Sequence, residues 1–326
     1  MRANKPLNFL QLQNDLDSTE IDSACIAFTS RRAAFSRRIR EAAIRNRTPM
    51  GMQAGLMIWL ATAPAAAPPT ELKLEATQGF DRYVQLTEAR MQHEVAAGAN
   101  FLRVDNLPEP RRTQEYARLR SGDMVAERLH TSDVSGEIRV PGAMIHHWLG
   151  TIFIPGAKLA DVLTIAEDFD RHADYYKPDV VQSKTLEHSG DGYRVFYRLR
   201  KEKIITVILD TEYNVRTHAV DLTRAYSESI STRITQVEHA GEAGEYELPP
   251  GHDDGFLWRL NSYWRYAEAD HGVYVQCEAI SLTRDIPTGL GWLVGPFIES
   301  VPKESLEFTL ESTRAAVLHR ASHANR

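Results

Sequence analysis

A long run of two-residue periodicity between two helical patterns is the feature that most constrains how this chain of 326 residues can fold. Residues 159–169 place apolar side chains on one helical stripe, and beyond Pro178 the period changes to two as far as Thr283. A helical pattern returns over 289–321, interrupted at Pro302. Consecutive strands with helices at the ends favour an α+β fold over a parallel α/β fold. We therefore expect a curved antiparallel sheet that grips a long C-terminal helix, preceded by an N-terminal helical extension.

Local signals predict the individual elements. Apolar residues at near-helical spacing predict an amphipathic helix over 81–96, and two prolines mark a connector over 101–110. Short strands are expected over 124–129 and 137–140, and a longer one over 147–154. Alternation and turn residues then predict strands over 180–188, 193–199, 204–214, 217–223, 227–237, 256–267 and 273–283.

The first 67 residues differ from the rest in charge. Residues 1–66 carry a net charge of +4, whereas the remainder carries −10. The apolar run 54–63 follows this basic stretch and leads into Ala63-Pro-Ala65, the pattern of a secretory signal. The run has about 10 residues, too few for a stable transmembrane helix, which needs about 20. We expect a polar leader (1–49, not necessarily part of the natural translated protein) and a signal-like segment within 1–67, cleavage near Ala65, and a secreted or periplasmic protein. The alternative is a cytoplasmic protein in which the run is a buried helix.

The remaining chain divides into an N-terminal helical extension, 68–135, and a ligand-binding domain, 136–321. After cleavage it would keep one cysteine, Cys277, which lies in an alternating strand and is interpreted as a packed structural thiol. The formal charge of −6 and the lack of a basic stripe argue against nucleic-acid partners.

Motifs for common cofactors and catalytic centres are missing from the sequence. We find no G-x-G-x-x-G after a strand, no phosphate loop, no C-x-x-C, no H-E-x-x-H and no G-x-S-x-G, so no cofactor is predicted. His146 and His147 have no companion at metal-ligand spacing, and the acidic loop around Asp253 lacks the spacing of an EF-hand, so no metal site is predicted. His172, among aspartates at a helix end, could serve as a general base, although solvated helix-end charges are the simpler interpretation.

Three segments carry a resemblance to a known family. They are the strand Trp148-Leu-Gly-Thr-Ile-Phe-Ile-Pro-Gly156, the helix end Ala166-Glu-Asp-Phe-Asp-Arg-His-Ala-Asp-Tyr-Tyr-Lys-Pro-Asp179 and the closing Val301-Pro-Lys-Glu-Ser-Leu-Glu-Phe-Thr-Leu310, together with the last strand pair. Residues 142–319 thereby resemble the START-like, or SRPBCC, helix-grip superfamily, which includes birch-pollen-allergen-like proteins, lipid-transfer domains and polyketide cyclases. Uncharacterised secreted bacterial members are the nearest in pattern. The resemblance implies an internal cavity, and it bears on fold more than on activity.

The last strand pair gives a register that the structure can test. A turn centred on Asp270-His271 places Trp264 opposite Cys277, with Ser262 opposite Ala279 and Leu260 opposite Ser281. Side chains alternate across a strand, so we expect the C-terminal helix to cover the face that holds Trp258, Leu260, Ser262, Trp264, Val275, Cys277, Ala279 and Ser281. The opposite face is polar enough to meet water, and it holds Arg259, Asn261, Tyr263, Arg265, Gln276, Glu278, Ile280 and Leu282.

Large aromatic residues opposite small ones have two interpretations. They indicate either interdigitated core packing or room for a ligand, and the family resemblance favours the cavity. The predicted ligand-binding residues are Trp148, Trp258, Leu260, Ser262, Trp264, Val275, Cys277, Ala279 and Ser281. The expected function is non-catalytic binding or carriage of a hydrophobic or lipid-like small molecule. The alternatives are a cyclase- or dehydratase-type enzyme, which needs a His, Asp or Glu in the cavity beside a polar partner, and an interaction domain without a ligand.

Overall fold

The computed structural model describes residues 71–97, 100–203, 206–285 and 291–324. Ala67–Arg326 forms one compact unit, to which every feature below belongs. The leader and the signal-like segment expected within 1–67 lie outside the described residues. None of the helices in the described ranges is both long enough and apolar enough to cross a membrane.

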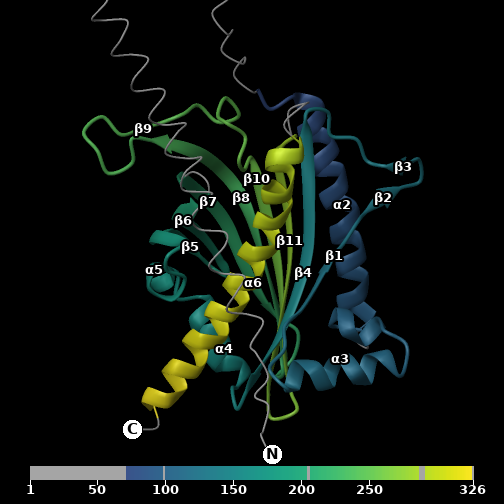
Figure 1. The fold of residues 1–326 in the computed structure, drawn as a ribbon. Coiled ribbons are helices and arrows are strands. Elements are labelled where there is room, and N and C mark those ends of the chain that lie inside the picture. The colour runs from purple at the N-terminus through teal and green to yellow at the C-terminus, as the bar shows by residue number, and fades with distance from the viewer. Residues whose placement is uncertain (1–70, 98–99, 204–205, 286–290, 325–326) are drawn as a thin grey trace, which may run out of the picture. The chain divides into compact units, whose positions relative to one another are not determined.

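Nine strands of the described chain form one antiparallel sheet, which confirms the predicted α+β class (Figure 1). The order across the sheet is β1-β4-β11-β10-β8-β7-β6-β5, with the short β9 beside β8. β2 and β3 form a separate small hairpin. The bounds are β1 Val125–Arg128, β2 Ser132–Asp133, β3 Gly136–Glu137, β4 Ala143–Pro155, β5 Val180–Ser189, β6 Gly192–Glu202, β7 Thr206–Ala219, β8 Arg224–Glu238, β9 Tyr246–Glu247, β10 Arg259–Ala269 and β11 Gly272–Arg284.

The predicted strands agree with this sheet except in two stretches. The strand expected over 137–140 is not formed, since β3 covers only Gly136–Glu137, pairs with β2 outside this sheet, and is followed by residues that belong to no strand. Residues 204–214 and 217–223 were expected as two strands, whereas residues 206–219 form the single strand β7. The turn that follows is held by backbone bonds from Val220 and Asp221 to the carbonyl of Arg224. The asparagine at 214 and the following residues therefore continue the alternation and do not end the strand.

Helices lie on both faces of the sheet. Their bounds are α2 Leu74–Ala97, η1 Arg103–Asn106, α3 Arg111–Arg120, α4 Leu159–Ala166, η2 Phe169–Arg171, α5 His172–Tyr175 and α6 Gly291–Ala324. We call the face that packs on α6 the inner face, and the face covered by α2 the outer face (Figure 1). α4 agrees with the expected helix, and α2 begins earlier than the expected residue 81. α6 continues through Pro302, where an interruption was expected, and α3 was not predicted.

Close packing holds α6 against the middle of the sheet. Leu306, Leu310 and Val317 are at most 5% exposed and share a core cluster with residues of β4 and β11. Gly150 permits this approach, since a Cβ atom placed on it would lie 2.5 Å from Cδ1 of Leu310. The glycine of the predicted strand 147–154 therefore has a packing role.

The hairpin of β10 and β11 has the predicted register. Trp264 pairs with Cys277, Ser262 with Ala279 and Leu260 with Ser281. The turn residues Asp270 and His271 have φ values of 53° and 60°. Positive φ at both central residues is the geometry of a two-residue turn that suits the twist of a hairpin.

The outer face of this hairpin does not meet water, so that prediction is wrong. Asn261, Arg265, Gln276 and Glu278 are all at most 5% exposed. α2 lies over them and buries Phe80 and Tyr83 against Ile280 and Leu282. The polar side chains are tolerated because α2 brings charged partners of its own, described below.

Candidate ligand-binding site

The inner face has a closely packed part and a partly exposed part. Val275 and Cys277 are at most 2% exposed beneath α6. Two residues beyond Cys277 on β11 lies Ala279, which pairs with Trp148 of β4 and with Ser262 of β10. The side chains of these three residues are only half-buried. The small residues Ala279 and Ser262 thus lie beside the larger Trp148.

Two further residues extend this row. Trp264 is half-buried beside it and its indole N–H donates to Oγ of Ser262 at 3.3 Å. Leu260 packs against a second inner cluster that includes Tyr213 and Val215. We call Trp148, Leu260, Ser262, Trp264 and Ala279 the inner row. It joins indole rings, aliphatic surface and a hydroxyl group, which suits an amphipathic molecule.

The structure places eight of the nine predicted ligand-binding residues on the inner face. Besides the inner row, these are Val275, Cys277 and Ser281, whose side chains are buried. Burial raises the pKa of the Cys277 thiol, which matches the expected structural role. Whether any of these residues binds a ligand remains a prediction.

Trp258 does not join them. It is 2% exposed and packs in the cluster beneath α2 together with Phe80 and Leu282. Its indole N–H donates to Oδ1 of Asp253 at 2.9 Å. The alternation that fixes the inner face starts only at Arg259, where β10 begins, so extending it one residue further gave the wrong face.

A histidine and two tyrosines line the inner face beside α4 and α5. The His172 ring bonds the carbonyl of Ile165 through Nε2 at 3.1 Å and the hydroxyl of Tyr197 through Nδ1 at 2.9 Å. Because a carbonyl only accepts, we assign the proton to Nε2 and the acceptor role to Nδ1. Burial lowers the pKa of His172 to about 4, so the ring is neutral near pH 7. With both nitrogens engaged, His172 is a structural link and not a free base.

Tyr176 connects this region to α6. Its hydroxyl bonds Oγ1 of Thr313 at 3.0 Å, and Thr313 donates to the carbonyl of Thr309 at 2.8 Å. Burial raises the pKa of Tyr176 to about 12, which keeps its proton in place. The inner face is thus lined by neutral hydroxyl groups near the point where α5 meets α6.

His146 and His147 point to opposite faces, as adjacent strand residues do. His146 lies inward and its Nε2 is 3.0 Å from Oγ1 of Thr283. Burial lowers the pKa of His146 to about 4. His147 lies outward, beneath α2. No group of three or more metal-ligating side chains occurs in the part of the chain that the structure describes.

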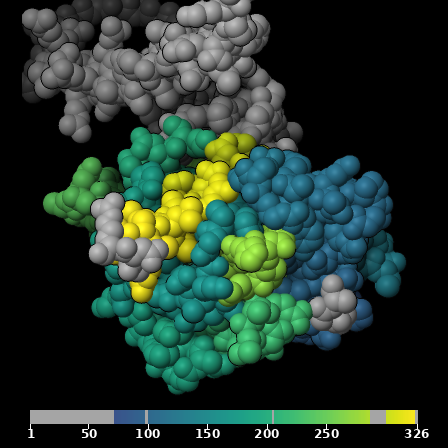
Figure 2. Space-filling model, turned by 90° about the horizontal axis from the view of Figure 1, so that it is seen from below, coloured from purple at the N-terminus to yellow at the C-terminus, as the bar shows by residue number. Residues whose placement is uncertain are grey.

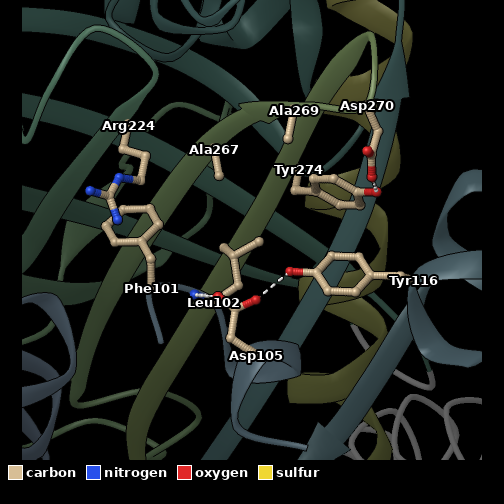
Figure 3. A pocket seen from close by; sticks show the side chains of 9 residues that line it. All are labelled: Phe101, Leu102, Asp105, Tyr116, Arg224, Ala267, Ala269, Asp270 and Tyr274. Carbon is tan, nitrogen blue, oxygen red and sulfur yellow. Dashed lines mark hydrogen bonds between the residues drawn. The ribbon is translucent and has the colours of Figure 1, made fainter. Parts of the chain in front are cut away.

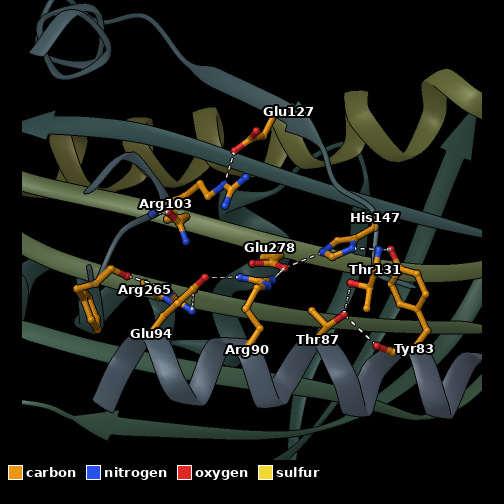
Figure 4. Close-up of polar contacts among 12 residues, drawn as sticks. Tyr83, Thr87, Arg90, Glu94, Arg103, Glu127, Thr131, His147, Arg265 and Glu278 are labelled. Atoms are coloured by element: carbon orange, nitrogen blue, oxygen red, sulfur yellow. Dashed lines mark hydrogen bonds and ion pairs between the residues drawn. The ribbon is translucent and has the colours of Figure 1, made fainter. Parts of the chain in front are cut away.

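The outer face holds a buried polar network that the sequence analysis missed (Figure 4). Glu278 accepts from Nε2 of His147 at 2.7 Å and from Arg90 of α2. Nδ1 of His147 lies 2.8 Å from the Tyr83 hydroxyl. We call Tyr83, Arg90, Glu94, His147, Arg265 and Glu278 the outer network.

Two ion pairs complete the outer network. Arg90 donates to Glu94 at 2.9 Å, and Glu94 accepts from Arg265 at 2.8 Å. Burial alone would raise the pKa of Glu278, but the hydrogen bond from His147 and the charges of Arg90 and Arg265 hold it below its ordinary value. A possible signal was the presence of Arg265 and Glu278 on one face of the predicted hairpin. Since α2 covers the network, we assign it to holding α2 on the sheet.

Comparison with known proteins gives structural similarity only. No protein-family model matches the sequence, and no curated protein is a significant match. The Thermus thermophilus protein TTHA0849 is 15% identical at a TM-score of 0.37, covering 55% of this chain and 97% of that one. A STAR-related lipid transfer protein from Xanthomonas axonopodis is 16% identical at 0.36, covering 58% and 98%. The Zhui aromatase/cyclase from Streptomyces sp. R1128 is 14% identical at 0.37, covering 56% and 97%.

The TM-scores and identities of these matches are low, so the helix-grip description rests on the strand order and on the packing of α6 against the inner face. No activity is transferred from these proteins to this chain.

Proposed function

We propose that this protein binds and carries a hydrophobic or amphipathic small molecule between the inner face and α6. The observation that supports the proposal most is the half-exposed inner row, on a face that α6 otherwise closes. Exposed indole and aliphatic surface in the middle of a sheet gains about 25 cal/mol for every Å² that a ligand removes from water.

The chemistry of the row indicates the kind of ligand. Trp148 and Trp264 offer flat apolar surface, and Ser262 offers a hydroxyl group. Two buried histidines of the inner face, His146 and His172, are neutral near pH 7 and bonded to neighbouring groups. This arrangement favours binding over acid–base catalysis of the cyclase kind.

A pocket-filling variant tests the proposal. Ala279→Leu adds three carbons to the floor of the row, and Ala267→Leu is the matched control because it adds the same group to the outer face of the neighbouring strand. Fluorescence titration with the neutral apolar dye N-phenyl-1-naphthylamine should show binding by the parent and by Ala267→Leu, and at least tenfold weaker binding by Ala279→Leu.

Two results contradict the proposal. One is equal dye binding by the parent and Ala279→Leu. The other is repeated isolation of the protein from its own cells without any small molecule detectable by mass spectrometry, and this second result favours a ligand-free interaction domain.

Export remains part of the proposal for the intact chain. The apolar run 54–63 and Ala63-Pro-Ala65 support it. Sequencing of the mature N-terminus should show loss of residues through about Ala65. Recovery of soluble cytoplasmic protein that still begins at Met1 contradicts export.

A further inference from the structure

A pocket lies on the outer face, on the side of the sheet opposite the inner row (Figure 3). Its volume is about 300 Å³, and η1, α3, β8, β10 and β11 all contribute to it. It lies near the end of the molecule where the β10–β11 turn is beside both α3 and the β7–β8 turn (Figure 2). No part of the proposed carrier function uses this pocket.

Small residues at the end of β10 create the hollow. Ala267 and Ala269 follow Tyr263 and Arg265 on the outer face, where the larger side chains fill the space beneath α2. α2 ends at Ala97, before it reaches this part of the strand. The two alanines therefore form a low floor that η1 and α3 border without filling.

Aromatic rings form the walls. Phe101 and Tyr274 are at most 3% exposed, and the rings of Tyr116 and Tyr274 meet edge to face with centroids 5.1 Å apart. Their buried surroundings hold these rings in place, so the apolar walls exist before any ligand arrives.

Two carboxylates face the same space, and the tyrosines orient both of them. The Tyr116 hydroxyl donates to Oδ1 of Asp105 at 2.5 Å, and the Tyr274 hydroxyl donates to Oδ2 of Asp270 at 2.6 Å. The backbone N–H of Leu102 donates to the other oxygen of Asp105 at 2.8 Å. The hydrogen bonds from Tyr274 and Arg120 lower the pKa of Asp270, so this group is ionised near pH 7.

The chain's own guanidinium groups already occupy the rim. Arg120 donates to Asp270 at 2.8 Å and to the Tyr274 hydroxyl at 3.2 Å. Arg224 lies over the Phe101 ring, 5.4 Å from its centroid. A ring face and a carboxylate both attract cations, and this pocket presents three aromatic rings and two carboxylates.

The pocket favours binding of an anion less than binding of a cation. Arg224 is paired with Asp221 at 2.8 Å and Arg120 with Asp270 at 2.8 Å, whereas Asp105 forms no ion pair within the described residues and accepts only from the Tyr116 hydroxyl and the Leu102 N–H. An anion in the pocket would also lie close to the carboxylates of Asp105 and Asp270, which like-charge repulsion disfavours.

We propose that the outer pocket binds a small organic cation, an ammonium group carried on an aromatic or apolar body. The body lies against Phe101, Tyr116 and Tyr274, and the ammonium group is directed at Asp105. The volume limits the ligand to a small molecule, at the lower end of the usual range for ligand pockets.

Two probes of equal shape and opposite charge test the proposal. Tryptamine and indole-3-acetate share the indole ring and a short chain, and calorimetric titration of the full chain compares their affinities. Tryptamine should bind at least tenfold more tightly than indole-3-acetate. Ala267→Leu should abolish tryptamine binding, and Asp105→Asn should weaken it about tenfold. Ala279→Leu, on the inner face, should leave it unchanged.

Several outcomes overturn the proposal. They are no tryptamine binding up to about 10 mM, equal binding of the two probes, or loss of tryptamine binding in Ala279→Leu but not in Ala267→Leu. Circular dichroism of each variant checks folding, and if Asp105→Asn is unfolded, the probe pair and the two alanine variants decide. The dye experiment on the inner row is independent, so either proposal can fail alone.

Discussion

Replacing Glu278 by glutamine keeps the shape of the side chain and removes its charge from the outer network. The parent carboxylate is 1% exposed and accepts hydrogen bonds from His147 and Arg90. Without its charge, the positive charges of Arg90 and Arg265 would be opposed only by Glu94.

The expected cost follows from burial. Removing one partner of a buried ion pair typically destabilises a protein by about 3–5 kcal/mol. Two features place the destabilisation by Glu278→Gln near the lower limit of this range. The Arg90 side chain is 33% exposed and can be partly solvated, and Oε2 of Glu278 is buried without a hydrogen-bond partner among the described residues, so the parent network is already incomplete. We expect a loss of about 3 kcal/mol, which lowers the Tm by roughly 6–12 °C in a domain of this size.

Urea unfolding at pH 7 measures this loss, and a double-mutant cycle with Arg90→Met assigns it. Methionine keeps much of the arginine stem but has no charge. The coupling between the two changes should be about 1–3 kcal/mol. If Glu278→Gln lies within about 0.5 kcal/mol of the parent, or if the two changes are additive, then the outer network does not hold α2 on the sheet.

Three further predictions concern the same structure. The pKa of Glu278 is lower in the folded state than its ordinary value of 4.5. The stabilisation by its charge is therefore complete above about pH 4.5 and is lost as the pH falls through the folded pKa. In urea titrations, the difference in unfolding free energy between the parent and Glu278→Gln should shrink in acid and not in base. Gly150→Ala should destabilise by about 1–3 kcal/mol, since its methyl group displaces Leu310, and unchanged stability would show that α6 is loosely seated. Tyr176→Phe should cost about 1 kcal/mol by removing the bond to Thr313, and a thermal melt that matches the parent would exclude this contribution.

The parts of the fold that depend on neighbouring residues could be predicted from the sequence. The turn at Asp270 and His271 and the alternation on either side specify the hairpin register without information from distant residues. The same alternation brought Ala279 and Ser262 together on the inner face. It gave the wrong face for Trp258 because the strand begins one residue later.

The outer layer could not be predicted in this way. Arg90 and Glu94 meet Glu278 and Arg265 across 188 and 171 residues of chain, and local periodicity carries no information about such pairs. A face that carries Arg265, Glu278 and Gln276 would be exposed to solvent if α2 did not cover it, which is why the sequence alone predicts exposure. The outer pocket was missed for the same reason, since it forms only where η1 and α3 border the end of β10.

Because helices cover both faces of β10 and β11, the packing on each face also specifies the register of these strands. A shift by one residue turns every side chain to the opposite side of a strand. In β11 such a shift would press the carboxylate of Glu278 against Leu310 and leave Cys277 among arginines. Most antiparallel sheets have one buried face, so a register shift is unfavourable on that face alone. Here a shifted strand would bury a charged side chain in the apolar core on one face and lose ion pairs on the other.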